Sequence, residues 1–154
     1  MSLSEVYGMA SSAMQANRLW IDVIANNVAN ANTTRTATGD PFRRQIPIFE
    51  QLMDKELAMQ STSFPGDGGE SGEVPLNYGK GVQATAIVGD QAPFKVIFNP
   101  GHPDADAKGF VRMPNISIIT EMVDMLAAQR NYDASVQLTN AAKTMGQKAL
   151  EIGR

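Results

Sequence analysis

The sequence predicts an α+β protein in which a long helix at each chain end flanks a small central β-rich region. Apolar residues recur at helical spacing near both ends, and no proline interrupts either repeat. Between them lie short apolar segments separated by glycine, proline and asparagine, as in strands joined by turns. We therefore divide the chain into an N-terminal helix (residues 1–32), a central β-rich region (33–114) and a C-terminal helix (115–154).

Composition narrows the class of protein. The chain has 154 residues, of which 43% are hydrophobic and 19% charged, enough apolar material for a core. It has no cysteine, which excludes disulfides, thiol nucleophiles and cysteine-ligated zinc. Its net charge is −3 and its basic residues are scattered, which argues against non-specific nucleic-acid binding. Neither a membrane-inserted segment nor a cleavable signal peptide is expected, because the long apolar runs that both need are missing.

The N-terminal segment opens with a capping box, since Ser2 and Glu5 stand three residues apart before an apolar repeat. A helix is expected over residues 5–28. Its apolar positions are Val6, Met9, Ala13, Ala16, Trp20, Val23 and Ile24. Only Glu5, Arg18 and Asp22 are charged in residues 1–32. A helix with one solvated face normally carries more charge, so we expect protein on most sides of this helix.

The first half of the central region mixes extended and irregular structure. Residues 42–49 are expected to be extended, with Pro41 and Pro47 interrupting the segment. Residues 51–60 favour a short helical turn. Residues 61–75 are rich in glycine, serine and acidic side chains and predict a flexible insertion.

The second half of the central region predicts three short strands. Residues 82–88 and 94–98 are apolar and β-branched, and the residues between them favour a hairpin connection. Residues 99–101 form a turn, and residues 108–113 predict the third strand.

The C-terminal segment is the longest predicted element. Pro114 stops the preceding structure, Asn115 or Ser117 caps a helix, and no proline follows from Ile118 to Ile152. Two apolar seams with near-heptad spacing run along it, as in a coiled coil. One seam contains Ile118, Met122, Met125, Gln129, Tyr132, Val136 and Thr139. The other contains Ile119, Met122, Leu126, Leu138, Ala142, Met145, Ala149 and Ile152.

The two helices carry more apolar surface than the small central region can cover. Pairing them buries one stripe on each and leaves the distal part and the second seam of the longer helix exposed. A long exposed apolar stripe usually marks an interface. The alternative is a monomeric helical hairpin whose outer surfaces are polar but uncharged.

The most specific string is the asparagine-rich end of the first helix, residues 25–33. Asn26, Asn27 and Asn30 share one face at spacings of three and four residues, and each amide both donates and accepts hydrogen bonds. Such a face suits a dense array of helix ends joined by side-chain hydrogen bonds. The competing interpretation is a frayed helix end in solvent.

These motifs carry a family resemblance. Residues 25–33 resemble the N-terminal signature of the flagellar axial proteins, the rod, hook and hook-associated subunits, and residues 116–132 resemble their C-terminal signature. Residues 99–107, with 109–111 and 113–115, resemble the proximal-rod branch of this family. The resemblance spans nearly the whole chain, and the glycine-rich insertion is its main departure.

The resemblance implies a non-enzymatic structural subunit of the bacterial flagellar basal body. It implies a place in the periplasmic rod, export by the flagellar type III apparatus without a cleaved signal, and transmission of torque. It implies no cofactor and no metal. The implied partners are other copies of this chain, other rod subunits and the adaptor at the export gate and MS ring. Terminal segments of the family are disordered in the monomer and fold on assembly into a coiled-coil layer.

The subunit contacts are predicted on both helices. On the first helix they are Met9, Ala13, Ala16, Trp20, Val23, Asn27 and Asn30. On the second helix they are Met122, Leu126, Gln129, Tyr132, Val136, Thr139 and Ala142.

Two alternatives remain at this stage. His102 with Asp104 and Asp106 has the ligand types of a metal site, which would fit an enzyme, although the same residues suit a turn in which aspartates bond nearby backbone. Residues 79–81 lack the spacing of a P-loop. The other alternative is a helical adaptor that binds one partner as a folded monomer or closed dimer.

Overall fold

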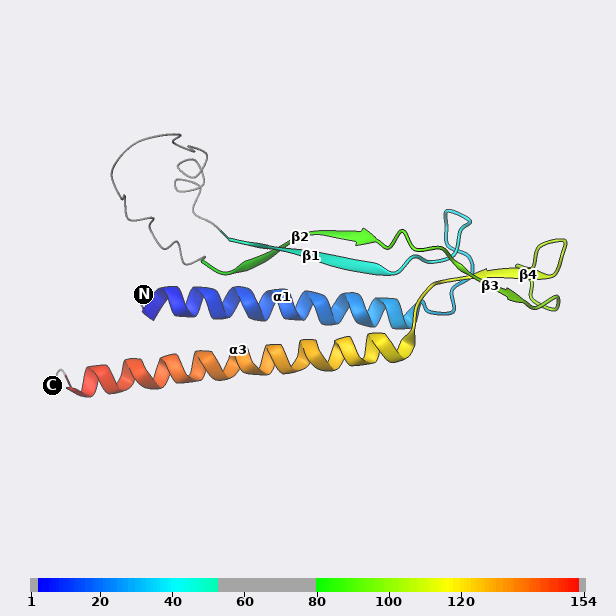
Figure 1. Ribbon diagram of the computed structural model, residues 1–154. Helices are drawn as coiled ribbons and strands as arrows, with labels where there is room; N and C mark the ends of the chain where they lie inside the picture. The colour runs from blue at the N-terminus through cyan, green and yellow to red at the C-terminus, as the bar shows by residue number, and fades with distance from the viewer. Residues whose placement is uncertain (1–2, 53–79, 153–154) are drawn as a thin grey trace, which may run out of the picture.

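The computed structural model describes residues 3–52 and 80–152, and it has the expected α+β architecture. The expected helical turn beyond residue 52 and the glycine-rich insertion at 61–75 lie outside the described residues. The molecule is elongated: two long helices lie side by side, a β-ribbon lies along one of them, and a second ribbon projects beyond their far end (Figure 1).

Both terminal helices are confirmed, and they pack antiparallel. Helix α1 spans Leu3–Ala29 and helix α3 spans Ile118–Ile152, each within two residues of the bounds expected from the sequence. The contact between α1 and α3 is the most extensive between elements of the described chain. The N-terminus and C-terminus therefore lie at the same end of the molecule (Figure 1).

The first ribbon covers a second side of α1. Strand β1 (Gln45–Gln51) pairs antiparallel with β2 (Val82–Gly89), with a register shift between Ile48 and Phe49. The strand runs through Pro47, which was expected to interrupt it, because a two-stranded ribbon leaves each strand one unpaired edge where proline is tolerated. Trp20 of α1 meets Phe49 edge-to-face, with ring centroids 6.4 Å apart.

The second ribbon corrects one expectation about pairing. Strand β3 (Lys95–Phe98) pairs with β4 (Phe110–Met113), and the hairpin predicted between residues 82–88 and 94–98 is wrong. The connection between β2 and β3 does not reverse the chain. The Asp90 amide bonds Arg44 O, and the Arg43 guanidinium lies 4.4 Å from the Phe94 ring centroid. These contacts guide the chain outward along the molecule.

The core is thin and made mostly of small residues. Five of the nine buried apolar residues in the described part of the chain are alanines. They are Ala10, Ala16, Ala31, Ala128 and Ala142, accompanied by Val23, Ile24, Val111 and Ile116. Most of them lie on α1 and α3. Among residues 3–52 and 80–152, neither helix has the continuous apolar stretch that spanning a membrane requires.

Candidate subunit interface

The face of α3 that packs on α1 carries one glutamate and three small side chains. Glu121, Ala128, Ser135 and Ala142 recur every seven residues, and they are exposed to only 1, 0, 9 and 0%. The two seams predicted from the sequence follow mainly large apolar residues. Ala142 is the one residue that they share with this buried series. The signal that would have found it is the heptad spacing of small residues, which permits two helix backbones to approach closely.

Large apolar side chains lie on the opposite side of α3. Ile119 and Val123 stand two positions either side of Glu121, a rotation of about 200° that turns them away from α1. Four residues at the spacing of an amphipathic helix form this patch, which we call the outer patch. They are Ile119, Met122, Val123 and Leu126, exposed to 78, 61, 62 and 50%. The large side chains of this helix are thus outside and the small ones inside, the reverse of a helix in a monomeric protein.

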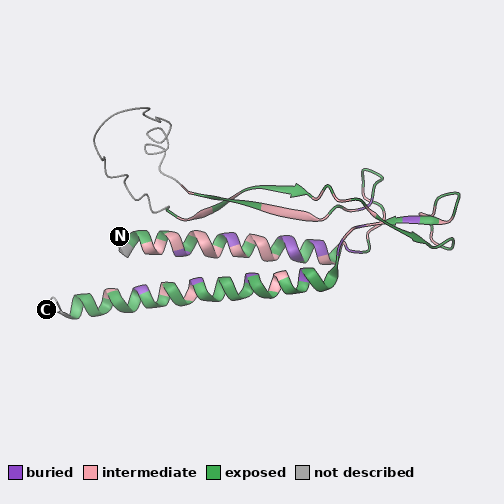
Figure 2. Ribbon diagram, in the orientation of Figure 1, coloured by how far each residue is buried: buried purple, intermediate pink, exposed green. Residues whose placement is uncertain are grey.

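The end of α3 also lacks a partner within the described chain. Because Asn27 meets Glu121 and the helices are antiparallel, Leu3 lies level with Met145. Residues 146–152 therefore extend beyond α1, by about 10 Å at 1.5 Å per residue. Met145 and Leu150 are exposed to 58 and 77%, and the terminal turns are almost entirely exposed in Figure 2. We call this segment the overhang.

Some of the predicted contact residues are buried within the subunit, and others are exposed on its surface. Those on α1 are half-buried or buried by α3 and the first ribbon: Met9, Ala13, Trp20 and Asn30 are half-buried, and Ala16, Val23 and Asn27 are buried. On α3, Val136 and Thr139 are half-buried, Ala142 is buried, and Met122, Leu126, Gln129 and Tyr132 are exposed. The low charge of α1 is thus explained by α3 and the first ribbon, which cover it within the same chain. The predicted contact residues that stay exposed lie on α3.

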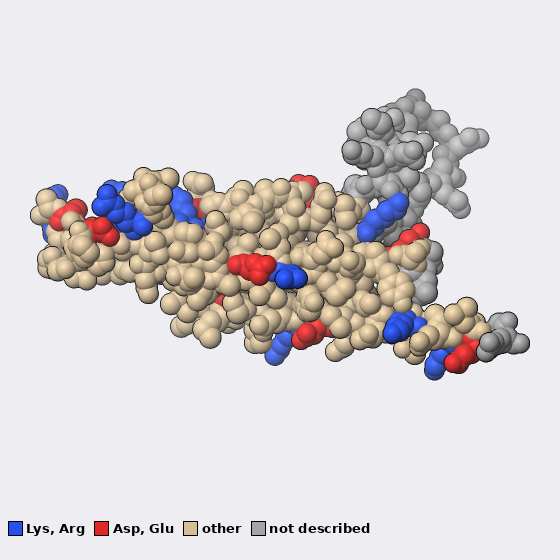
Figure 3. All heavy atoms as spheres, turned by 180° about the vertical axis from the view of Figure 1, so that it is seen from behind, with Lys and Arg blue, Asp and Glu red and all other residues tan. Residues whose placement is uncertain are grey.

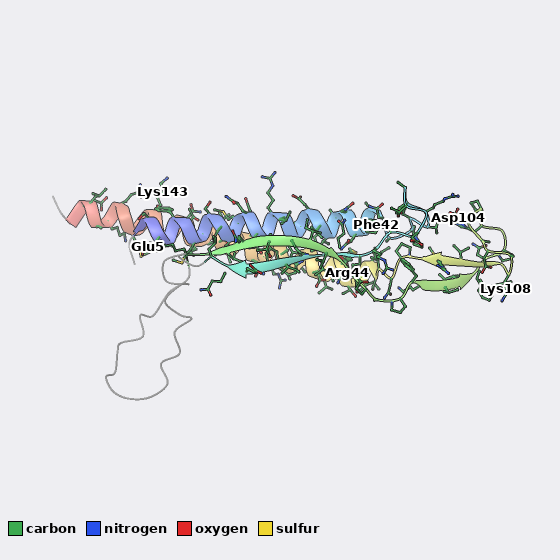
Figure 4. The ribbon with its side chains drawn as sticks, turned by 90° about the horizontal axis from the view of Figure 1, so that it is seen from above. Glu5, Phe42, Arg44, Asp104, Lys108 and Lys143 are labelled. Carbon is green, nitrogen blue, oxygen red and sulfur yellow. The ribbon has the colours of Figure 1, made fainter. Side chains whose placement is uncertain are left out.

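A buried polar cluster joins α1, β1 and α3. Asn27 Nδ2 donates to Gln45 O at 2.9 Å, and Gln45 N donates to Asn27 Oδ1 at 2.8 Å, so this amide pairs with a strand residue as a neighbouring strand would. Asn27 Nδ2 also donates to Glu121 Oε2 at 3.1 Å. Arg44 Nε donates to Glu121 Oε1 at 2.5 Å, and its Nη2 donates to Asp124 Oδ2 at 3.2 Å. Arg44 lies beside the helix pair in Figure 4.

Every buried side-chain nitrogen and oxygen in the described ranges has a hydrogen-bond partner. The carboxylate of Glu121, 1% exposed, is therefore neutralised and bonded from two sides. Of this cluster, Asn27 was predicted from the sequence as a contact residue, whereas Arg44, Gln45, Glu121 and Asp124 were not. An acidic residue inside an otherwise apolar helix start was the available signal.

Asn26 and Asn30 form hydrogen bonds at the end of α1 with residues of the same chain. Asn30 Nδ2 donates to the backbone and side-chain oxygens of Asn26, at 3.0 and 2.9 Å, and Thr33 Oγ1 donates to Asn30 Oδ1 at 3.2 Å. Asn26 Nδ2 in turn donates to Gln45 Oε1 at 2.8 Å. The helix end is therefore bonded rather than frayed, and its contact with neighbouring subunits stays a prediction.

The loop that carries His102 forms a turn. His102 Nδ1 accepts from the Asp104 amide, and Asp106 Oδ1 accepts from the amides of Lys108 and Phe110. Asp104 Oδ2 accepts from the Thr34 hydroxyl at 2.7 Å. Asp106 is thus a backbone-bonding aspartate of the turn interpretation, whereas the Asp104 side chain bonds a side chain of a distant segment. In the described ranges no three His, Cys, Asp or Glu side chains gather as metal ligands.

Charge is sparse on the face shown in Figure 3, where Lys, Arg, Asp and Glu are scattered over a largely uncharged surface. A surface of this kind lacks the dense basic stripe that neutralises nucleic-acid phosphates.

Comparison with known proteins finds two matching families, one at each end of the chain. Residues 9–35 match the family described as "Flagella basal body rod protein", and residues 107–152 match "Flagellar basal body rod FlgEFG protein C-terminal".

Full-length relatives are also found. The chain is 38% identical to a flagellar basal-body rod protein FlgC of Borreliella burgdorferi, over 99% of this chain and 98% of the relative. It is 36% identical to the protein of the same name from Yersinia enterocolitica, over the whole of both chains. It is 35% identical to that of Bacillus subtilis, over 95% of each.

Proposed function

Because this chain belongs to the family of flagellar basal-body rod proteins FlgC, we propose that it polymerises through its terminal helices in the proximal rod. Membership makes the chain a structural subunit of the flagellar basal body rather than an enzyme, with other rod subunits as its partners. The polymerisation contacts, the passage of torque and the export route are parts of the proposal.

The outer patch is the observation that carries the proposal. Four large apolar side chains stand at least half exposed along about two turns of α3, while the same turns bury Glu121 against α1. Leaving this much apolar surface in water is unfavourable by about 25 cal/mol per Å². Neighbouring subunits that cover the patch recover that free energy, so assembly stabilises the helix pair.

Two of the exposed apolar surfaces in the described chain lie at opposite ends of α3. The outer patch occupies its first turns, whereas Met145 and the overhang, with Leu150, occupy its last turns. A contact between unlike surfaces of successive subunits does not close on itself and generates a helical filament. In such a filament torque passes from subunit to subunit through packed helices.

The thin core supports the proposed route of export. A helix pair held by alanines and one polar cluster has little buried apolar area, so opening the chain costs little. A readily unfolded subunit suits passage through the narrow channel of the flagellar type III apparatus. At the base of the rod, the proposed partner is the adaptor between the export gate and the MS ring.

Amide hydrogen exchange tests the proposal against the adaptor alternative. We expect rapid exchange in residues 1–32 and 117–154 of the isolated subunit and slow exchange of the same residues in purified basal bodies, because neighbours order the helices. A closed monomer or dimer whose termini are protected in isolation would instead support an adaptor that binds one partner.

A further inference from the structure

We propose that the end of the molecule opposite the chain termini carries a docking groove for the last turns of a C-terminal helix from a neighbouring rod subunit. The proposal rests on the proposed function, because it needs neighbours in the rod. The residues that line the groove lie between 34 and 112, in the central region. The groove therefore uses none of the terminal segments that are expected to order only on assembly.

One wall of the groove is the second ribbon. Val96 pairs with Arg112 and Phe98 pairs with Phe110, so these four side chains share one face of the ribbon. Val96, Phe98 and Phe110 are exposed to 61, 63 and 41%. The two phenyl rings meet edge-to-face with centroids 5.3 Å apart. The face is thus apolar, with one cation beside it, and the described chain leaves it largely in solvent.

The other wall is the loop that follows α1. Thr34 Oγ1 donates to Asp104 Oδ2 at 2.7 Å, which ties this loop to the turn between β3 and β4. A hollow of about 590 Å³ lies between the loop and the ribbon, and we call it the tip groove. It lies where the second ribbon projects beyond the helices (Figure 1), at the end marked by Asp104 in Figure 4. Its lining includes Arg35, Asp40, Val96, Phe110 and Arg112.

The dimensions of the ribbon face suit a helix end. Strands β3 and β4 pair over four residues, about 13 Å at 3.3 Å per residue. Two strands about 4.8 Å apart, with their side chains, offer a width close to the diameter of a helix, about 10 Å. The overhang of this chain is about 10 Å long, so a segment of that kind would lie along the face without extending far beyond it.

The end of α3 shows the chemistry of the expected occupant. The series of α3 residues that faces α1 continues from Ala142 to Ala149, which is exposed because α1 begins at Leu3, level with Met145. Met145 and Leu150 lie on either side of Ala149 and are exposed to 58 and 77%. Residues 107–152 match a family of rod-protein C-termini, so we expect neighbouring rod subunits to end in apolar helix turns of the same kind.

Charge favours the C-terminal end of a helix in this groove. The last turn of α3 contains no basic residue, so its unpaired carbonyls and the negative end of its dipole lack a cation on the same helix. Arg112 is exposed and takes part in none of the ion pairs within the described ranges. Arg35 is 73% exposed and lies 4.0 Å from Asp104. Both guanidinium groups are therefore free to bond the carbonyls of an incoming helix end.

Photo-cross-linking in assembled basal bodies tests the proposal. The full chain carries the photo-reactive residue p-benzoylphenylalanine in place of Val96, and basal bodies are purified after irradiation of the cells. Mass spectrometry then identifies the linked peptide. We expect it to be the last two turns of the C-terminal helix of a rod subunit.

The control position is Lys108. It is exposed at the same end of the molecule (Figure 4) but does not line the groove. The same photo-reactive residue at this position is expected not to link to the C-terminal helix that position 96 reaches. Equal linking from both positions would show that the helix lies near the tip without occupying the groove, which would overturn the proposal.

A charge reversal tests the role of the arginine. Arg112→Glu places a negative charge beside the negative end of the incoming helix, so we expect the yield of the link from position 96 to fall by roughly tenfold. Lys108→Glu makes the same change of charge outside the groove and is expected to leave the yield unchanged. Equal yields in the two variants would contradict the docking of a helix C-terminus at this site.

Failure of the proposal is distinguishable from failure of the proposed function. A variant that assembles but links to another part of the rod, or to nothing, overturns the docking groove and leaves polymerisation intact. If the position 96 variant does not assemble, p-benzoylphenylalanine in place of Phe110, which keeps a phenyl ring, makes the same measurement from β4. Absence of the unmodified chain from basal bodies would instead contradict the proposed function.

Discussion

Asn27 and Glu121 stand 94 residues apart in the chain, yet Nδ2 of the first lies 3.1 Å from Oε2 of the second. The bond joins the end of α1 to the start of α3, and both residues are 1% exposed. It therefore connects the two terminal helices at the point where the ribbon also meets them. The stability of the helix pair should depend on this point more than on any other polar contact described here.

Removing the glutamate is expected to destabilise the subunit. Glu121→Ala removes the buried acceptor of Arg44 Nε and Asn27 Nδ2, whereas Arg44 keeps Asp124 and Asn27 keeps Gln45, so the expected loss in the free energy of unfolding is about 1–3 kcal/mol. Asp124→Ala is the matched control: its side chain is 34% exposed, and a pair of that kind is worth about 1 kcal/mol or less. Urea unfolding of both variants checks the difference, and equal midpoints would show that the cluster is not a centre of stability.

A charge in the outer patch is expected to block assembly without unfolding the subunit. Leu126→Asp places a carboxylate where a neighbour is proposed to pack, whereas the isolated chain leaves this position 50% exposed. We expect circular dichroism like that of the parent chain, loss of the subunit from purified basal bodies, and loss of swimming in soft agar.

Gln137→Asp is the control for that variant. Gln137 lies on the same side of α3 about three turns further on, is exposed, and is already polar. Its replacement is expected to leave incorporation and swimming intact. Normal swimming with Leu126→Asp would remove the outer patch from the subunit interface.

The sequence predicted the helices well because their signals are local. Both extend within two residues of the expected bounds, since capping residues, prolines and apolar periodicity act over a few positions. The strands were found for the same reason. Their pairing was not, because β1 and β2 are separated by 30 residues of chain and nothing local to residues 82–98 reveals a distant partner.

The candidate site was predicted in part. Met122 and Leu126 were named as contact residues, and they are exposed in the outer patch. The inward face of α3 was missed, because a periodicity search follows large apolar residues whereas this face uses Ala128 and Ala142. The partners of Asn27 were missed because a buried ion pair depends on the tertiary arrangement of three elements.

A further prediction concerns the small residues of α3 that pack against α1. Ala128 is 0% exposed against α1, so Ala128→Leu is expected to push the helices apart and lower the free energy of unfolding by about 1–3 kcal/mol. Ala127→Leu adds the same side chain one position away on the exposed face and is expected to change stability little. Denaturant unfolding distinguishes the two. Similar midpoints would mean that the helices are not packed through this seam.

Gly81 is expected to be intolerant of a side chain. Its φ of +132° disfavours L residues, and an added Cβ would lie 2.1 Å from Ser12 Oγ, which accepts the Val82 amide and bonds Met9 O. Gly81→Ala should cost about 1–3 kcal/mol of stability and loosen the ribbon from α1. Gly8→Ala, in α1 with open space around it, should raise stability by about 0.5–1 kcal/mol. Opposite shifts in the thermal midpoint would confirm this, and a neutral Gly81→Ala would contradict the close approach of ribbon and helix.

The central claim is that neighbouring subunits cover the apolar surface that this chain leaves open. A cryo-EM map of isolated basal bodies tests it most directly, because it shows what lies against Ile119, Met122, Val123 and Leu126. We predict side chains of another rod subunit packed over these four residues, with the overhang also in contact with a neighbour. A map in which the outer patch faces solvent in the assembled rod would contradict the claim.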